Sequence, residues 1–254
     1  MLQFAGPLQP NPARDEVFIA TVQQEFPNVI NRSFLPVDTP PTAPYMTLAS
    51  TSSQLALSTV QADFEVRFYG EYLTDTERAL EYVERKLGAV LRGLDAIGAS
   101  VETVGLIGTL HFSLLEGEEK AALHVLRTHL RTTVDEASVQ DALARVAVRV
   151  RDTYFVTLTL SNYELRVLEQ PIMPGMQLVR MRPGQGRLDD EGLELQVDIN
   201  NNLEVRAGGN STRVTADGIA AVSRLLREIA TTAGPAFAQT GSISVQDLSA
   251  SSTV

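Results

Sequence analysis

The feature that most limits the fold is a change in hydrophobic period along one stretch of the chain. From Val60 to Phe68 apolar and polar side chains alternate, which indicates a half-buried antiparallel strand. The segment 74–97 then places apolar residues at helical spacing, and Thr74 with Glu77 predicts a capping box at its start. The chain is therefore expected to pack an antiparallel sheet against amphipathic helices.

The same order of elements recurs later in the chain. "FEVRFYG" at 64–70 is similar to "LEVRAGG" at 203–209, and each lies between an alternating segment and a long amphipathic one. This predicts an α+β fold of two similar halves, each a mostly antiparallel sheet with a long helix, in a β-β-α-β-like duplication. We expect residues 1–134 to form the N-terminal half, 135–239 the C-terminal half, and 240–254 a mostly disordered Ser-rich tail.

Periodicity, caps and turn residues assign the remaining segments. Helices are predicted at 11–26, 118–131, 136–143 and 215–234, the last capped by Thr215. Strands are predicted at 104–115, 145–150, 153–168 and 242–245, and a hairpin at 193–208. Proline and glycine predict connectors at 36–44 and 170–192, the second with a strand at 177–181 as an alternative.

Composition excludes several classes of protein. The 254 residues include no cysteine, which rules out disulfide scaffolds, thiolate metal sites and cysteine nucleophiles. No apolar run is long enough for a membrane-spanning helix, and the first residues lack the basic start and apolar core of a signal peptide. We therefore expect a cytoplasmic protein. The formal net charge of −10 argues against a general nucleic-acid binder.

Catalytic and metal-binding patterns are also missing. His124 and His129 are five residues apart, which does not stack two ligands on one helix face, and His111 has no acidic neighbour in sequence. "DINNNLE" lacks the glycine and glutamate of a calcium loop, where Leu203 and Gly209 stand instead. No G-x-S-x-G, Walker or dinucleotide-binding motif occurs. We expect no metal and no cofactor, and these patterns favour a non-catalytic protein over an enzyme.

The candidate partner- or anion-binding residues are arginines: Arg145, Arg149, Arg151, Arg180, Arg182 and Arg187. The first three fall on one face of a predicted strand and form a positive stripe. This stripe either faces solvent, pairs with acids of a neighbouring strand, or binds an acidic partner or nucleic acid. The last three flank the glycines of "RPGQGR", whose backbone amides could hold an anion. Alternatively, that loop is a flexible hairpin whose arginines are offset by nearby acids.

Several short motifs point to a known family. They are "EFP" at 25–27, "VGLIGTLHFSL" at 104–114, "LQVDINN" at 195–201 and "AF" at 236–237. Through them the chain resembles a family of sporadically distributed, uncharacterised prokaryotic proteins of similar length. The resemblance implies a bacterial protein and supplies no activity.

Three hypotheses for function follow from these patterns. The first is a non-catalytic bacterial interaction or accessory protein that binds a protein partner or itself, for example as a component of a multi-protein system. The second is a nucleic-acid or nucleotide-binding protein that uses the arginine-bearing strand and the "RPGQGR" loop. The third is a hydrolase whose site carries no recognisable motif.

Overall fold

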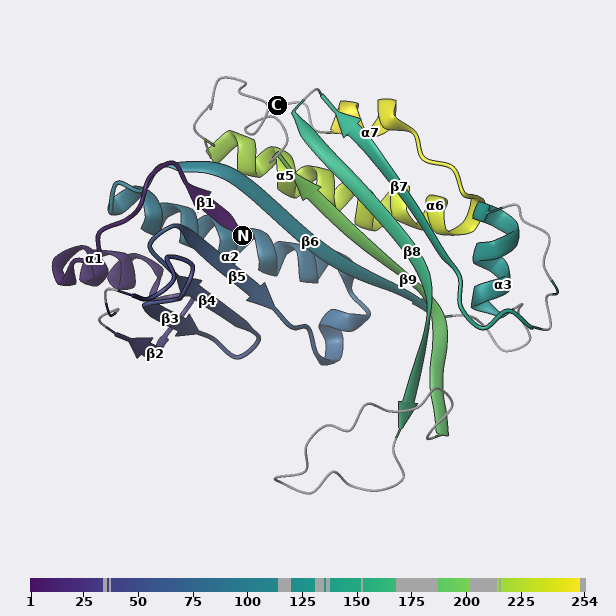
Figure 1. Cartoon of the computed structure of the whole chain (residues 1–254), viewed down its shortest axis with the longest axis horizontal. Helices are drawn as coiled ribbons and strands as arrows, with labels where there is room; N and C mark the ends of the chain where they lie inside the picture. The colour runs from purple at the N-terminus through teal and green to yellow at the C-terminus, as the bar shows by residue number, and fades with distance from the viewer. Residues whose placement is uncertain are drawn as a thin grey trace.

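The computed structural model describes residues 1–33, 36, 38–113, 120–130, 135, 138–151, 153–167, 187–201, 214 and 216–251. Among these residues, nine strands form one antiparallel sheet in the order β2-β3-β4-β5-β1-β6-β9-β8-β7, which confirms the predicted α+β class (Figure 1). The strands are β1 (Leu2–Phe4), β2 (Asn28–Arg32), β3 (Met46–Ala49), β4 (Ser53–Leu57), β5 (Gln61–Val66), β6 (Val101–Ser113), β7 (Leu143–Val150), β8 (Tyr154–Val167) and β9 (Arg187–Asn200).

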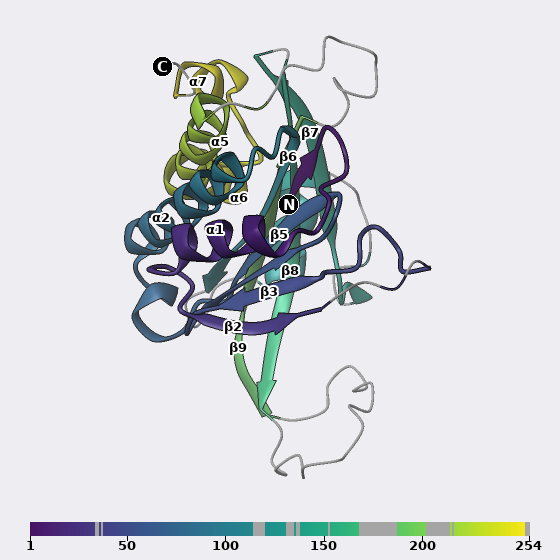
Figure 2. The ribbon, with the colours of Figure 1, turned by 90° about the vertical axis from the view of Figure 1, so that its left-hand side faces the viewer.

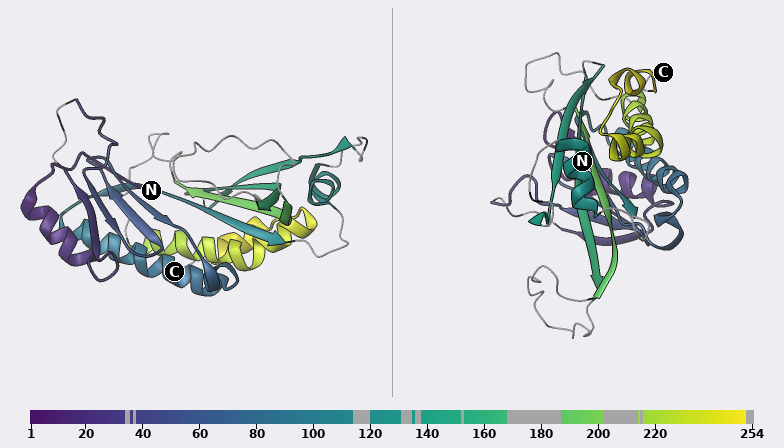
Figure 3. Two further views of the ribbon diagram at one scale, coloured as in Figure 1. Left: turned by 90° about the horizontal axis from the view of Figure 1, so that it is seen from below. Right: turned by 90° about the vertical axis from the view of Figure 1, so that its right-hand side faces the viewer.

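The helices lie on one side of the sheet (Figure 2). They are α1 (Pro12–Val22), α2 (Thr76–Ala96), α3 (Ala121–Val125), α5 (Ala216–Glu228), α6 (Gly234–Thr240) and α7 (Val245–Ser251). A 3₁₀ turn, η1 (Gly70–Leu73), precedes α2. Two π-helical segments continue other helices, η2 (Leu126–Leu130) after α3 and η4 (Ile229–Ala233) between α5 and α6. The views in Figure 3 show the same one-sided layering along the length of the sheet.

Strand β6 joins the two ends of the sheet. Its first residues, 101–104, pair with β1, and residues 105–113 pair with β9. The strands that precede residue 134 and those that follow it are therefore hydrogen-bonded into one continuous sheet.

The predicted helix at 74–97 is present as α2, and its apolar face lies in the core. Leu80, Leu87, Val90 and Leu94 are all buried. Gly93 allows α1 to approach closely, because a Cβ at this position would lie 2.7 Å from Val22 Cγ1. A larger residue here would push the two helices apart.

The start of α2 differs from the prediction by one residue. Asp75 is the N-cap, and its carboxylate accepts a hydrogen bond of 3.0 Å from the Arg78 N–H. Thr74 instead donates its hydroxyl to the Glu71 carbonyl at 3.2 Å. Thr74, which the capping box predicted as the N-cap of α2, therefore ends the η1 turn instead.

The C-terminal region also differs from the prediction. Residues 242–244 form no strand, and α7 begins at Val245, within the stretch expected to be a mostly disordered tail. The Ser244 hydroxyl accepts a hydrogen bond from the Asp247 N–H at 3.3 Å, and Leu248 is fully buried. A helix cap and an apolar anchor thus outweigh the β-like pattern of "SISV".

Other boundaries shift as well. Strand β9 begins at Arg187, inside the predicted connector, and Leu143 belongs to β7 rather than to a helix. The predicted helix after Thr215 continues further than expected, through η4 into α6. The predicted cap Thr215, the strand at 177–181 and the second strand of the hairpin at 193–208 lie outside the described residues.

Candidate functional site

No described helix covers one face of strands β7, β8, β9 and β6, and we call this surface the open face. Alternation along each strand sends apolar side chains such as Leu158 and Val197 into the core and the intervening side chains outward. The outward residues are Leu143, Arg145, Ala147 and Arg149 on β7, Phe155, Thr157, Thr159 and Ser161 on β8, Glu194, Gln196, Asp198 and Asn200 on β9, and Gly105, Ile107, Thr109 and His111 on β6.

A hollow of about 300 Å³ lies on the open face beside Arg145. It is lined by Leu143, Arg145, Thr157, Thr159, Gln196 and Asp198. The sheet register accounts for this grouping, because Arg145 lies opposite Thr159, which lies opposite Gln196. Hydroxyl, amide, guanidinium and carboxylate groups thus converge in a small space, which is typical of a surface that binds polar groups.

The two arginines of the open face have different surroundings. Arg149 lies over the ring of Phe155, its cross-strand neighbour, with its guanidinium carbon 5.7 Å from the ring centroid. Arg145 is exposed and makes no hydrogen bond or ion pair within the described chain. Since a guanidinium has five N–H donors, Arg145 can offer several of them to a carboxylate or phosphate.

Arg151 does not join the other two arginines. It lies in the turn after β7 with a φ of 54°, in the left-handed region. Its Nε donates a hydrogen bond of 2.9 Å to the Ser249 carbonyl oxygen in α7. The turn therefore directs Arg151 to the helix and away from the predicted stripe.

The loop arginines are not brought to the same place. Arg187 begins β9 and forms an ion pair of 3.8 Å with Asp189. It lies nine positions before Gln196 on β9, which is about 30 Å along an extended strand. Arg180 and Arg182 lie outside the described residues. The structure thus separates Arg187 from the hollow at Arg145.

A hydrogen-bonded cluster at the end of β6 was not predicted from the sequence. His111 lies 3.1 Å from the Glu194 carboxylate and stacks on Tyr163 at 4.6 Å between centroids. Tyr163 donates to the Asp190 carboxylate at 2.7 Å, and Ser113 donates to the same carboxylate at 3.1 Å. His111 and Glu194 are 83 residues apart, so only the register of β6 with β9 reveals the pair.

This cluster has the marks of a structural network. Burial, the largest effect, raises the pKa of Tyr163, so its hydroxyl stays protonated and keeps donating to Asp190. The His111 side chain is 54% exposed, and water screens its interaction with Glu194.

The remaining histidines pack against the C-terminal helices. His124 Nε2 lies 2.8 Å from the Ala238 carbonyl oxygen, and His129 packs edge-on against Phe237. Burial is the main cause of a lowered pKa for His129. Among the described residues, no group of three or more His, Asp or Glu side chains is arranged to hold a metal ion.

A buried cluster surrounds Lys86 on α2. Its ammonium lies 3.3 Å from the Glu25 carboxylate and 3.1 Å from the Ser50 hydroxyl. The Tyr82 hydroxyl lies 3.1 Å from Ser50 and 3.2 Å from Ser53. Because these serines flank the turn between β3 and β4, the cluster fastens that turn to α2.

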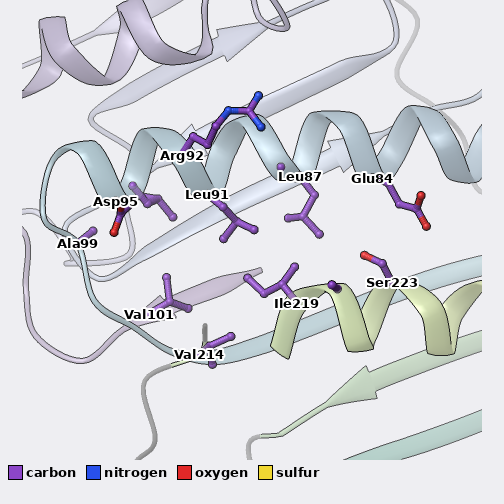
Figure 4. A pocket seen from close by; sticks show the side chains of 13 residues that line it. Glu84, Leu87, Leu91, Arg92, Asp95, Ala99, Val101, Val214, Ile219 and Ser223 are labelled. Carbon is purple, nitrogen blue, oxygen red and sulfur yellow. The ribbon is translucent and has the colours of Figure 1, made fainter. Parts of the chain in front are cut away.

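A groove of about 610 Å³ separates α2 from α5 (Figure 4). Leu87 and Leu91 point into it from α2, Ile219 points into it from α5, and Arg92 points away. Glu84 at its rim already accepts a hydrogen bond of 3.1 Å from Arg227. The groove thus presents mainly apolar walls, and the open face has more groups that could orient a partner.

Comparisons with known proteins identify no relative of this chain. No protein-family profile, curated protein or solved structure matches the chain. Within the described residues, no helix combines the length and apolar character needed to cross a membrane.

Proposed function

We propose that this chain is a non-catalytic bacterial interaction protein whose open face is the contact surface for a protein partner. The observation that carries the proposal is Arg145, which is exposed beside a polar hollow and has no hydrogen bond or ion pair within the described chain. An arginine in this position can form a bidentate contact with an acidic side chain of a partner.

The composition of the open face supports the same proposal. Arginine and aromatic residues are enriched at protein interfaces, and Arg145, Arg149 and Phe155 lie together here. Ile107 and Leu143 on this face are 68% and 55% exposed. Apolar side chains among polar ones are typical of a non-obligate interface.

We further propose that the protein is cytoplasmic, that it acts within a multi-protein system, and that its two halves arose by duplication. Support for the duplication is that β5 precedes α2, β9 precedes α5, and both helices lie on the same side of the sheet. The family resemblance of the sequence supports a bacterial origin.

Nucleic-acid binding is the second candidate, and one observation favours it. Arg145 and Arg149 lie near Phe155 on a sheet face that no described helix covers, an arrangement that could contact phosphates and stack a base. Glu194 and Asp198 on the same face argue against nucleic-acid binding, and so does the net charge of −10.

Recovery of partners with the full-length chain tests the proposal. Tagged wild-type protein, Arg145→Glu and Arg92→Glu are expressed in the native bacterium, and co-purifying proteins are quantified by mass spectrometry. Arg92 is an exposed arginine on α2, so its reversal changes the net charge equally without touching the open face. We expect Arg145→Glu alone to lose the partner. Recovery that is equal in all three samples contradicts the proposal, as does recovery of neither another protein nor an untagged copy of the chain.

Binding to oligonucleotides separates the two candidates. Fluorescence anisotropy with labelled single-stranded and duplex probes is measured at about 50 mM and about 200 mM salt, a range over which phosphate contacts weaken steeply. We expect no binding to either probe. Salt-sensitive binding that Arg145→Glu abolishes would support the nucleic-acid candidate instead.

A further inference from the structure

Strands β8 and β9 extend beyond the rest of the sheet as a two-stranded ribbon (Figure 1). Strand β6 ends opposite Gly192, and β7 begins opposite Ser161. Beyond these points, residues 164–167 of β8 and 187–191 of β9 pair only with each other among the described strands. We call these two segments the ribbon. Both of its edges therefore present backbone groups that no described strand pairs.

Apolar side chains are exposed on the ribbon. Leu165 and Leu188 are 55% and 42% exposed, and an isolated two-stranded ribbon has little stability of its own in water. Its sequence contains four acidic residues against two arginines. The ribbon thus exposes leucine side chains and carries a net negative charge, which complements an exposed arginine that has no ion pair within the described chain.

Asp189 is the acidic residue of the ribbon best placed to meet a partner. The register of β8 with β9 shifts beside it, so Leu165 pairs with Asp190, Arg166 pairs with Leu188, and Asp189 has no residue opposite. Such bulges turn a side chain away from the regular ladder. The Asp189 side chain is 45% exposed, and its contact with Arg187, at 3.8 Å, is a long one. Asp190 is already bound by Tyr163 and Ser113.

The complementary surface is β7 with the hollow at Arg145. Strand β7 is the last strand of the sheet and pairs only with β8 among the described strands, so its outer edge can accept another strand. Leu143, at the rim of the hollow, is 55% exposed and could cover a leucine of the ribbon.

We propose that the ribbon of one copy docks on β7 of a second copy, with Asp189 seated against Arg145 in the hollow. This inference rests on the proposed function, because it makes a second copy the partner of the open face. The contact is reciprocal in a two-fold dimer, in which each copy gives one ribbon and receives one.

Sedimentation velocity of the full-length protein over a concentration series tests the proposal. We expect a reversible dimer for the wild type. Arg145→Glu and Asp189→Arg each place like charges together, so each should raise the dissociation constant at least about tenfold. Arg92→Glu should leave it unchanged. Circular dichroism checks that each variant is folded. If Arg145→Glu does not fold, Arg145→Gln is used in its place.

An equal mixture of Arg145→Glu and Asp189→Arg provides the sharpest arm of the test. Each contact in the mixed dimer joins opposite charges, so the mixture should dimerise although each variant alone is weakened. A wild-type monomer, a dimer indifferent to Arg145, or a mixture that stays monomeric overturns the proposal. If the wild type is monomeric but recovery of another partner still depends on Arg145, self-docking fails and the proposed function stands.

Discussion

The ammonium of Lys86 lies 3.3 Å from the carboxylate of Glu25, and only 4% of the Lys86 side chain is exposed. Replacing Lys86 removes a buried cation from both the Glu25 carboxylate and the Ser50 hydroxyl, and leaves Glu25 with the more exposed Arg85. We expect Lys86→Met to lower the free energy of unfolding by about 3 kcal/mol, as measured by urea denaturation.

Arg85 is the matched control for this variant, because it also lies 3.3 Å from Glu25 but is 60% exposed. Arg85→Met should cost no more than about 1 kcal/mol, as is usual for an exposed pair. Equal costs for the two variants would show that burial does not strengthen the Lys86 interaction.

The same cluster should make the stability of the protein depend on pH. Burial opposes ionisation of Tyr82, but its hydrogen bonds with Ser50 and Ser53 and the charge of Lys86 outweigh burial and lower the pKa of Tyr82 below 10.0. Between the folded-state pKa and that of the unfolded phenol, the unfolded chain binds more protons. Stability relative to Tyr82→Phe should therefore rise as the pH rises through this window, and be lost as the pH falls through the folded-state pKa.

Absorbance at the phenolate band, together with urea denaturation at several pH values, measures this effect. Burial raises the pKa of Tyr45, Tyr154 and Tyr163, so these residues titrate later than Tyr82. Tyr82→Phe should remove an early ionisation step. A titration curve that is unchanged at its acidic end in this variant would contradict the prediction.

Replacing two leucines with alanine should lower the free energy of unfolding by different amounts. Leu158 is fully buried, and Leu158→Ala should lower the free energy of unfolding by about 4–5 kcal/mol. Leu87 lines the groove beside α5, so fewer contacts are lost, and Leu87→Ala should cost about 2 kcal/mol. Thermal or urea unfolding measures both. An unchanged melting temperature for Leu87→Ala would mean that α2 presents another face to the core.

Arg149 should contribute to stability through Phe155. Arg149→Glu removes a cation over the ring at 5.7 Å, and we expect a loss of about 0.5–1 kcal/mol. The effect should shrink in a Phe155→Leu background, which a double-mutant cycle measures. Additive effects would show that the guanidinium and the ring do not interact.

Long periodic segments account for what the sequence predicts correctly. Twenty-one residues of α2 repeat one apolar stripe, and its face to the core follows from helical spacing alone. Alternation in β7 likewise predicts that Arg145 and Arg149 lie outward while Val146 and Val148 face inward.

Short and long-range features account for what the sequence does not predict. Strand β1 has three residues, too few to show a period, and it forms because β5 and β6 pair with it on both sides. The His111–Glu194 contact depends on the register of strands far apart in sequence. Arg151 leaves the predicted stripe because its positive φ ends the alternation at the turn.

Hydrogen exchange of the full-length protein, free and bound to its partner, tests the contact surface most directly. We predict slower exchange of the backbone amides in β7 (Leu143–Val150) on binding, and unchanged exchange in α2 (Thr76–Ala96). Protection confined to the groove between α2 and α5, with β7 unchanged, would contradict the assignment of the open face.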